Sequence, residues 1–302
     1  MLLDTASLYF RAYYGVPDTF RAPDGQPVNA VRGLLDFISR LVAQYSPTHL
    51  ACCWDNDWRP QWRVDLLPTY KGHRVVATRP GESPDIEEVP DPLNAQIPII
   101  TAALNAFGIA IVGANQHEAD DVIGTLATNA GMPVDVVTGD RDLFQLVDDE
   151  REVRVLYTAR GVGRHELVTD EVVVAKYSVL PSQYADFATL RGDASDGLPG
   201  VAGVGEMTAS ALLLKYGDLT GIRLAANDPA SDMANGPRTK ILAAADYLDV
   251  APKVVAVVRD LELGTPDLSL PRTPAHPDLL AQLAIDYALE SPVTRLTQSL
   301  QR

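Results

Sequence analysis

The sequence predicts an α/β protein built on a mainly parallel β-sheet with helices on both faces. Three observations carry this prediction. In the first half of the chain, short apolar runs alternate with amphipathic stretches; acidic residues follow the ends of several of these runs; and after about residue 180 the pattern changes to helices joined by glycine-rich turns. Strand–helix alternation is typical of parallel sheets, because each parallel connection needs a crossover that a helix usually provides.

The alternating elements follow one another in order. Apolar residues in 28–44 recur with helical spacing, whereas 49–54 is a short apolar run of the kind that forms a buried strand. On the same grounds, further strands are expected at 2–3, 110–112, 134–138 and 153–157, and further helices at 97–107, 122–129 and 141–147.

Beyond residue 180 the expected structure is helical. Five glycines lie between Leu190 and Tyr216, a helix is expected at 207–215, and a last helix is expected from about Pro277 to Leu289. The proline-rich stretch 264–277 is expected to be an ordered connector. The chain therefore divides into two regions, 1–180 and 181–302.

Composition indicates a soluble globular protein, with 46% hydrophobic and 22% charged residues. No apolar run approaches the roughly 20 residues of a membrane span, and the start of the chain lacks the features of a signal peptide. The two cysteines, Cys52 and Cys53, are adjacent in an apolar run, where a disulfide would be strained. We therefore expect buried thiols and a cytoplasmic protein.

The charge balance argues against a nucleic-acid partner, because the chain has 40 acidic residues and only 25 basic ones and its net negative charge repels phosphates. One stretch differs: 58–80 carries five basic residues against Asp65 alone, together with Trp58, Trp62 and Tyr70. Aromatic residues among bases suit phosphate contact and base stacking. Taken by itself, this stretch fits a solvated loop with incidental charge better.

Acidic residues close three of the predicted strands, as Asp4, Asp55 and Asp140. Because the carboxyl ends of parallel strands line one crevice, we expect these side chains to converge. Three further acidic groups lie at helix or turn junctions, in the sequences HEADD, TGDRD and GDASD. Helix capping explains one or two acids in each group, but nine carboxylates cannot all ionise in proximity without cations. Oxygen-only ligands predict a site for two or more Mg²⁺ or Mn²⁺ ions.

The HEADD group has a predicted internal geometry. At about 100° per helical residue, Glu118 and Asp121 share nearly one face, and Asp120 points to one side. We expect Glu118 and Asp120 nearest a catalytic ion, with Asp121 supporting them.

Taken in order, these motifs resemble the 5′→3′ exonuclease and flap endonuclease family, whose bacterial member is usually the N-terminal domain of DNA polymerase I. The matching segments are LLDTASLYFRAYY, WDNDWRPQWRVDLLPTYKGHR, HEADDVIGTLA, VVTGDRDLFQLV and LRGDASDGLPGVAGVGEMTASALL. The resemblance implies a PIN-like nuclease core over 1–180, with a helical arch at about 58–98, and a helix–hairpin–helix DNA-binding region with C-terminal helices over 181–302. Gly197 stands where relatives often have asparagine. Because the chain stops at residue 302, a standalone nuclease is expected.

The resemblance also implies the activity: metal-dependent hydrolysis of DNA near 5′ ends, flaps or nicks in replication and repair, with RNA primer segments as a further substrate, in the nucleoid. It assigns nine acids to the metal site, with Asp193 and Asp196 holding a second ion partly through water: Asp4, Asp55, Glu118, Asp120, Asp121, Asp140, Asp142, Asp193 and Asp196.

The same resemblance assigns the contacts with DNA. Lys71 and Arg74 approach the scissile phosphate, Tyr70 stacks on the displaced nucleotide, and Arg63 reaches the 5′ strand. Lys71, Arg74 and Asp120 are the expected catalytic residues. Duplex binding and a K⁺ ion held by backbone carbonyls fall on the hairpin, at Gly200, Gly203, Gly205 and Thr208.

Two alternatives remain open at this point. One is a paralogue that binds branched DNA without cutting it, which loss of several acids would signal, but all nine are present. The other is a ribonuclease of the PIN type, which is usually about half this length and lacks the arch and hairpin. The sequence leaves the oligomeric state open.

Overall fold

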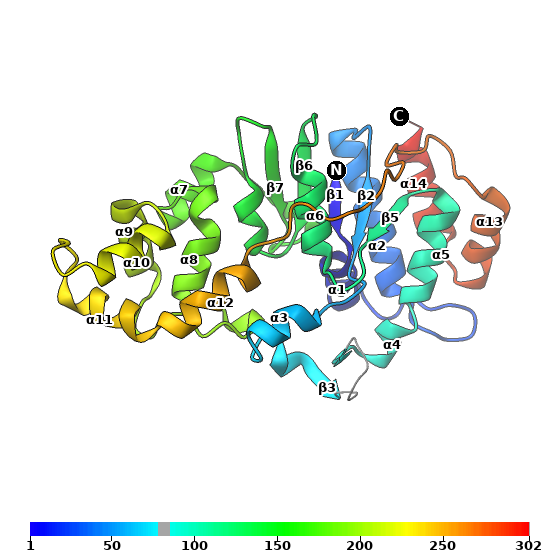
Figure 1. Ribbon diagram of the computed structural model, residues 1–302. Helices are drawn as coiled ribbons and strands as arrows, with labels where there is room; N and C mark the ends of the chain where they lie inside the picture. Colours follow the sequence, from blue (N-terminus) through cyan, green and yellow to red (C-terminus); the bar gives the residue numbers. More distant parts are fainter. Residues whose placement is uncertain (78–84, 302) are drawn as a thin grey trace.

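The protein, described here by a computed structural model over residues 1–77 and 85–301, is organised around a six-stranded sheet (Figure 1). The strand order is β5-β2-β1-β6-β7-β8. Every neighbouring pair is parallel except β7 with β8. The strands are β1 Leu2–Asp4, β2 Ala51–Trp54, β5 Ala110–Gly113, β6 Val134–Thr138, β7 Val153–Tyr157 and β8 Glu166–Val168. The predicted α/β class is confirmed, and the antiparallel edge strand β8 is an addition to it.

Both faces of the sheet are buried, which explains why its strands are continuous apolar runs. Successive strand residues point to opposite faces, so Leu2 and Cys53 join one hydrophobic core while Leu3 and Cys52 join the other. Both thiols are free and buried, as predicted.

Helices cover the two faces in separate groups. The core containing Leu3 is closed by α1 Thr5–Gly15, α2 Asn29–Tyr45, α5 Ile97–Phe107, α13 Pro277–Asp286 and α14 Glu290–Leu300. The opposite core is closed by α6 Ala119–Ala127, the 3₁₀ helix Asp142–Leu146 and α7 Asp170–Tyr177, and it continues into α8 Tyr184–Arg191, α9 Glu206–Tyr216, α10 Leu219–Asn227, α11 Asn235–Ala243 and α12 Ala245–Val255. Figure 1 shows α8 to α12 extending to one side of the sheet.

Two helical predictions need correction. Helix α1 was not expected, because Asp4 was assigned only to a strand end; its Oδ1 also accepts a hydrogen bond from Ser7 N (3.1 Å) and so caps the helix. The helix expected from Pro277 to Leu289 is α13, which ends at Asp286, and α14 follows it where no helix was expected; Ala288 between them adopts a left-handed φ of 52°. The expected connector is ordered, with Leu50 N donating to Leu268 O (2.8 Å).

The predicted arch, 58–98, is only partly helical. Its described part consists of α3 Gln61–Leu66, a 3₁₀ turn Gly72–Arg74, the two-stranded ribbon of β3 Val75–Ala77 and β4 Ile86–Glu87, and α4 Asp91–Asn94. Arg79, one of the five bases of this stretch, lies outside the described residues. Within 1–77 and 85–301, no helix has both the length and the apolarity to cross a membrane.

The packing of α1 on α2 depends on Gly33. A Cβ at this position would lie 2.6 Å from Ala12 Cβ and 2.9 Å from Val16 Cγ2, closer than real contacts allow. Gly33→Val should therefore lower the free energy of unfolding by about 1–3 kcal/mol, measured by urea denaturation. Gly236→Ala, where a Cβ meets nothing within 4 Å, is the control and should not destabilise. Equal stability of the two variants would contradict this packing.

Candidate active site

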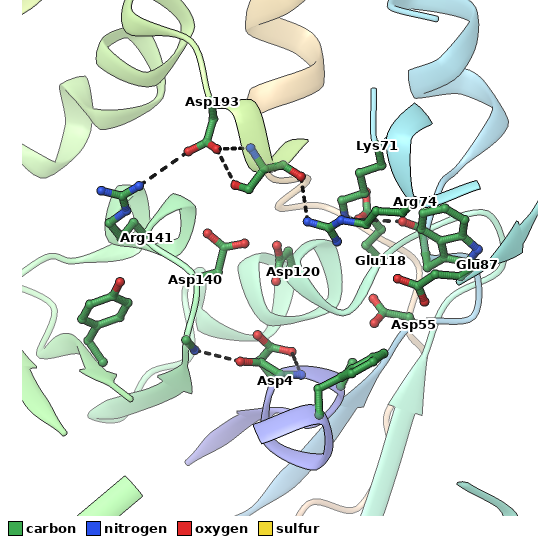
Figure 2. A pocket seen from close by; sticks show the side chains of 17 residues that line it. Asp4, Asp55, Lys71, Arg74, Glu87, Glu118, Asp120, Asp140, Arg141 and Asp193 are labelled. Carbon is green, nitrogen blue, oxygen red and sulfur yellow. Dashed lines mark hydrogen bonds and ion pairs between the residues drawn. The ribbon is translucent and has the colours of Figure 1, made fainter. Parts of the chain in front are cut away.

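Acidic side chains from neighbouring strands meet at the carboxyl edge of the sheet. Asp4 ends β1, Asp55 follows β2 and Asp140 follows β6, and these three strands are adjacent in the sheet. All three carboxylates line one cavity of about 430 Å³. Eight residues predicted for the site line this cavity: Asp4, Asp55, Lys71, Arg74, Glu118, Asp120, Asp140 and Asp193 (Figure 2).

Asp4, Asp120 and Asp140 form the centre of the cavity, and Figure 2 shows their carboxylates turned toward one another from three different elements. Burial, followed by the nearby charge of Asp55, raises the pKa of Asp4 from 3.8 to about 7. Burial and the charges of Asp4 and Asp140 also raise the pKa of Asp120 well above its usual range. Like charges are therefore concentrated here with little compensation from protein cations.

Glu118 and Asp121 lie at the start of α6, where Glu118 lines the cavity and Asp121 is fully buried, and both bind one arginine. Arg63 donates through Nη1 to Glu118 Oε2 (2.6 Å) and through Nη2 to Asp121 Oδ1 (2.7 Å). Arg63, Glu118 and Asp121 are at most 3% exposed. The predicted shared face of Glu118 and Asp121 is confirmed.

Glu118 accepts two further donors. Tyr70 Oη donates to its Oε2 (2.7 Å), and the Lys71 ammonium forms an ion pair with its Oε1. Lys71 adopts a left-handed φ of 47°, uncommon for a residue with a side chain, and its backbone N donates to Asp196 O (2.9 Å). These contacts fix the lysine at the border of the cavity.

Arg63 and Tyr70, which the resemblance assigns to contacts with DNA, are both buried in this structure. Tyr70 is 4% exposed, and its ring and hydroxyl are enclosed beside Glu118. The N–H groups of the Arg63 guanidinium donate to two carboxylates and to Val254 O (3.1 Å). Neither side chain offers a surface to a nucleotide in this arrangement, so both position the acidic wall instead. Arg59 is buried as well, with an ion pair to Asp85.

A third wall comes from the GDASD turn. Asp193 lines the cavity and pairs with Arg191 (3.3 Å), while Asp196 is buried behind it and pairs with Arg74 (3.3 Å). Burial is the main reason that the pKa of Asp196 rises to about 6. Gly197 explains the departure noted in the sequence: a Cβ here would lie 2.1 Å from Thr69 O, so the residue lets this turn meet the chain before Lys71.

Asp142 is a further buried acid that sequence motifs placed in the site. It does not line the cavity, but its backbone N donates to Asp140 Oδ1 (2.9 Å) and its own Oδ1 is buried without a hydrogen-bond partner. Burial and the charge of Asp140 raise its pKa well above the usual range. A buried oxygen of this kind is suited to a cation or a water molecule.

The donor set suits a hard divalent cation, since it consists of carboxylate oxygens. Within the described part of the chain, no group of three or more His, Cys, Asp or Glu side chains is placed so that it could hold a metal ion by itself. This fits an ion that is bound through one or two carboxylates and water, as Mg²⁺ commonly is, better than a closed protein cage.

The predicted hairpin lies between α8 and α9. Gly200 and Gly203 have left-handed φ values of 67° and 76°, and a Cβ on Gly200 would lie 2.5 Å from Arg191 O, so glycine is required there. Gly205 precedes α9, and its carbonyl accepts from Thr208 N (3.0 Å). Neither these three glycines nor Thr208 lines the acidic cavity.

Sequence reasoning missed several residues of the site. Trp58, Glu87 and Arg141 line the cavity, and Lys240 on α11 donates to the hairpin carbonyl Gly203 O (2.8 Å). Trp58 was noted only as an aromatic residue among bases. Lys240 had no local signal, because it reaches the hairpin from a helix 37 residues further along the chain.

Comparison with known proteins agrees with this architecture. The family model of the 5′-3′ exonuclease N-terminal resolvase-like domain matches residues 1–178, and that of the 5′-3′ exonuclease C-terminal SAM fold matches 179–278. A 5′-3′ exonuclease of Streptomyces coelicolor is 56% identical over 300 residues, 99% of either chain. A 5′-3′ exonuclease of Mycobacterium tuberculosis is 50% identical over 309 residues, 99% of this chain and 97% of the relative.

Among solved structures, the bacteriophage T5 D15 flap endonuclease, in a complex with DNA and metal ions, matches with a TM-score of 0.65 at 16% identity, over 99% of this chain and 97% of that one. The chain belongs to the 5′-3′ exonuclease family. The family and the PIN-like fold with a C-terminal helical region, both inferred from the ordered motifs, are thereby confirmed.

The shared arginine gives a stability prediction. Arg63→Ala leaves the buried Asp121 carboxylate without an ion pair and takes one of two cationic partners from Glu118, so it should lower the free energy of unfolding by about 3–5 kcal/mol. Tyr70→Phe removes a single donor and should cost about 1 kcal/mol. Urea denaturation with EDTA present measures both.

The matched control is Lys176→Ala. It breaks an ion pair whose side chains are 43% and 39% exposed, so it should cost less than about 1 kcal/mol. A loss for Arg63→Ala no larger than that of the control would refute the positioning role.

Proposed function

We propose that this nuclease hydrolyses DNA phosphodiesters at 5′ flaps, nicks and 5′ ends, with two or more Mg²⁺ or Mn²⁺ ions held at the acidic cavity. The observation that carries the proposal is the convergence of Asp4, Asp120 and Asp140 beside the cations Lys71 and Arg74. Carboxylates can bind metal ions, and lysine or arginine can offset the negative charge of a phosphoryl group. Both kinds of group that a phosphodiesterase needs therefore line the same cavity.

The carboxylates divide into two proposed groups. One or two of the carboxylates Asp4, Asp120 and Asp140, with water, hold a first ion, and Asp193, with Asp142 and Asp196 behind it, holds a second, partly through water. Ions bound there would supply an activated water nucleophile and stabilise the leaving oxygen. Asp142 Oδ1 has no hydrogen-bond partner, and the pKa of Asp120 is raised. Both observations support this division, because they are expected of carboxylates whose negative charge no protein cation offsets.

Asp55, Glu118 and Asp121 play supporting parts in this proposal. Asp55 Oδ1 accepts from Ala119 N (2.7 Å) and so ties β2 to the start of α6. Glu118 lines the cavity with its oxygens already bonded to Arg63, Tyr70 and Lys71. The expected position of Glu118 nearest a catalytic ion requires the Lys71 ammonium to break its ion pair with Glu118. The ammonium is then free to approach a phosphate.

Substrate positioning falls to residues around the cavity. Arg74 donates to Ser195 O (2.8 Å) at the cavity rim, where its guanidinium can also meet phosphoryl oxygens. The hairpin with Gly200, Gly203 and Gly205, followed by Thr208 on α9, is the proposed contact to duplex phosphates without sequence readout. The Lys240 ammonium adds a positive charge beside Gly203. A K⁺ ion at the hairpin carbonyls remains part of the proposal, and RNA primer segments remain a proposed substrate.

Metal removal tests the activity directly. Excess EDTA should abolish cleavage of a 5′-flap DNA, and added Mg²⁺ or Mn²⁺ should restore it. Asp120→Asn and Lys71→Ala should each lower the cleavage rate by at least about 100-fold, since they remove a metal ligand and a phosphate contact, while circular dichroism stays unchanged. Full activity of both variants, or cleavage undiminished in EDTA, would sink the site assignment. A matched RNA flap, cleaved better than the DNA flap, would favour the ribonuclease alternative.

The pH dependence of stability follows from Asp4. Its pKa in the folded protein is about 7 against the usual 3.8, so the folded state binds the proton more tightly. The stabilisation from this proton is present at low pH and is lost as pH rises through about 7. In EDTA, the melting temperature should therefore fall as the pH rises from 3.8 to about 7.

Asp4→Asn should flatten that fall and remove part of the increase in melting temperature that Mn²⁺ produces at pH 8, because the variant lacks one like charge and one ligand. The scan compares the variant with the wild-type chain, with and without Mn²⁺. A wild-type melting temperature that rises with pH in EDTA would contradict the assignment.

A further inference from the structure

Arg59 is a buried cation next to the acidic cavity. Its neighbour in sequence, Trp58, lines the cavity, whereas Arg59 does not. The Arg59 side chain is 7% exposed, so it offers no surface to DNA. A buried guanidinium is costly unless its donors are bonded and its charge is paired. The partners of Arg59 therefore show which part of the molecule it holds in place.

Two donors of Arg59 hold the turn that leads into Lys71. Its Nε donates to Tyr70 O (2.6 Å) and its Nη2 donates to Pro68 O (2.9 Å). The turn is closed by Tyr70 N, which donates to Leu67 O (2.9 Å). A planar guanidinium that binds two carbonyls at once fixes the orientation of both peptide groups, which the single ammonium of a lysine does less well. The chain directly before Lys71 is therefore fixed from the buried side.

Lys71 needs such support, because its backbone has a left-handed φ of 47°. A residue with a Cβ persists in this conformation only where its surroundings impose it. The peptide that joins Tyr70 to Lys71 is bonded at both of its polar groups: its carbonyl accepts from Arg59, and its N–H donates to Asp196 O (2.9 Å). The side chain of Lys71 then enters the cavity, where its ammonium pairs with Glu118.

The remaining side-chain donor of Arg59 joins a second segment to the same turn. Its Nη1 forms an ion pair with Asp85, whose backbone O also accepts from Trp58 Nε1 (2.8 Å). Asp85 directly precedes β4, and Glu87 at the end of β4 lines the cavity. Figure 2 shows Glu87 on the same side of the cavity as Lys71. Arg59 thus connects the two segments that carry these cavity residues.

Resting on the proposed function, we propose that Arg59 is a positioning residue for hydrolysis and acts through Lys71. It holds the peptide before Lys71 so that the ammonium, once released from Glu118, approaches the scissile phosphate from one fixed direction. Arg59 itself touches neither the substrate nor a metal ion. Its loss therefore slows the cutting of bound DNA and leaves DNA binding unchanged.

A double-mutant cycle between Arg59 and Lys71 tests this role. Cleavage of a 5′-flap DNA is measured in a single turnover, with the enzyme in saturating excess and Mg²⁺ present. Arg59→Lys keeps a charge beside Asp85 but loses the fork of donors. It should lower the rate constant by about 10- to 100-fold, because a small misplacement of a catalytic group has an effect of this order. The Kd for the same DNA, measured by fluorescence anisotropy in EDTA, should be unchanged.

The same substitution is then made in the Lys71→Ala background. Because Arg59 acts through the Lys71 ammonium, adding Arg59→Lys to Lys71→Ala should change the residual rate constant by less than about twofold. An arginine that only stabilises the fold would slow cleavage in both backgrounds by the same factor. Equal slowing in the two backgrounds, or no slowing by Arg59→Lys alone, would overturn the proposal.

Two further variants separate positioning from stability. Arg295→Lys loses a fork of two hydrogen bonds to Asp36 (2.8 and 3.0 Å) away from the cavity, and it should leave the rate constant unchanged. If circular dichroism shows that Arg59→Lys does not fold, Arg59→Gln combined with Asp85→Asn takes its place, because this pair leaves no buried charge unpaired. It should show the same coupling to Lys71→Ala.

The proposed function is judged separately, by cleavage of the same flap by the wild-type chain in Mg²⁺. If the wild-type chain does not cut, the proposed function fails. If it cuts and the cycle shows no coupling between the two residues, only the role of Arg59 fails.

Discussion

Arg63 holds two buried carboxylates, Glu118 and Asp121, and the arrangement around the cavity depends on that contact. The arginine sits on α3, both acids sit at the start of α6, and its Nε donates to Val254 O at the end of α12 (3.1 Å). Three elements distant in sequence are thus joined by one guanidinium. Its planar fork of donors suits two carboxylates at once, which a lysine could not satisfy in the same way. The wall of the cavity is rigid because its charges are paired on the side facing the protein.

The nine acids consequently fall into two electrostatic classes. Glu118, Asp121, Asp193 and Asp196 have arginine or lysine partners in ion pairs, whereas Asp4, Asp55, Asp120, Asp140 and Asp142 have none among the described residues. The unpaired class surrounds the centre of the cavity or lies directly behind it. The net charge of −15 is therefore a poor guide to whether this protein binds DNA, because part of the negative charge is concentrated where metal cations are expected.

Much of the fold and part of the site could be predicted because the signals are local. Apolar strand runs, acids at strand ends and the helical geometry of HEADD depend only on neighbouring residues, and Glu118 and Asp121 do share a face. The failures share the opposite cause. From the resemblance, Arg63 and Tyr70 were expected to contact DNA, but their partners in the structure are 48 to 191 residues away in sequence. In the sequence, a basic residue and its acidic partner are far apart, and only the tertiary structure brings the two side chains into contact. Lys240 escaped notice for the same reason.

The central claim is that the carboxylates at the centre of the cavity hold a divalent cation and that the pair bound by Arg63, Glu118 and Asp121, does not. A crystal structure of the full chain grown with Mn²⁺ tests it most directly, because anomalous scattering locates the ions independently of the protein. The account predicts Mn²⁺ coordinated by Asp4, Asp120 or Asp140, with Arg63 still bound to Asp121. Ions found only at other surfaces, or an ion that displaces Arg63 from Asp121 while the centre of the cavity binds none, would contradict it.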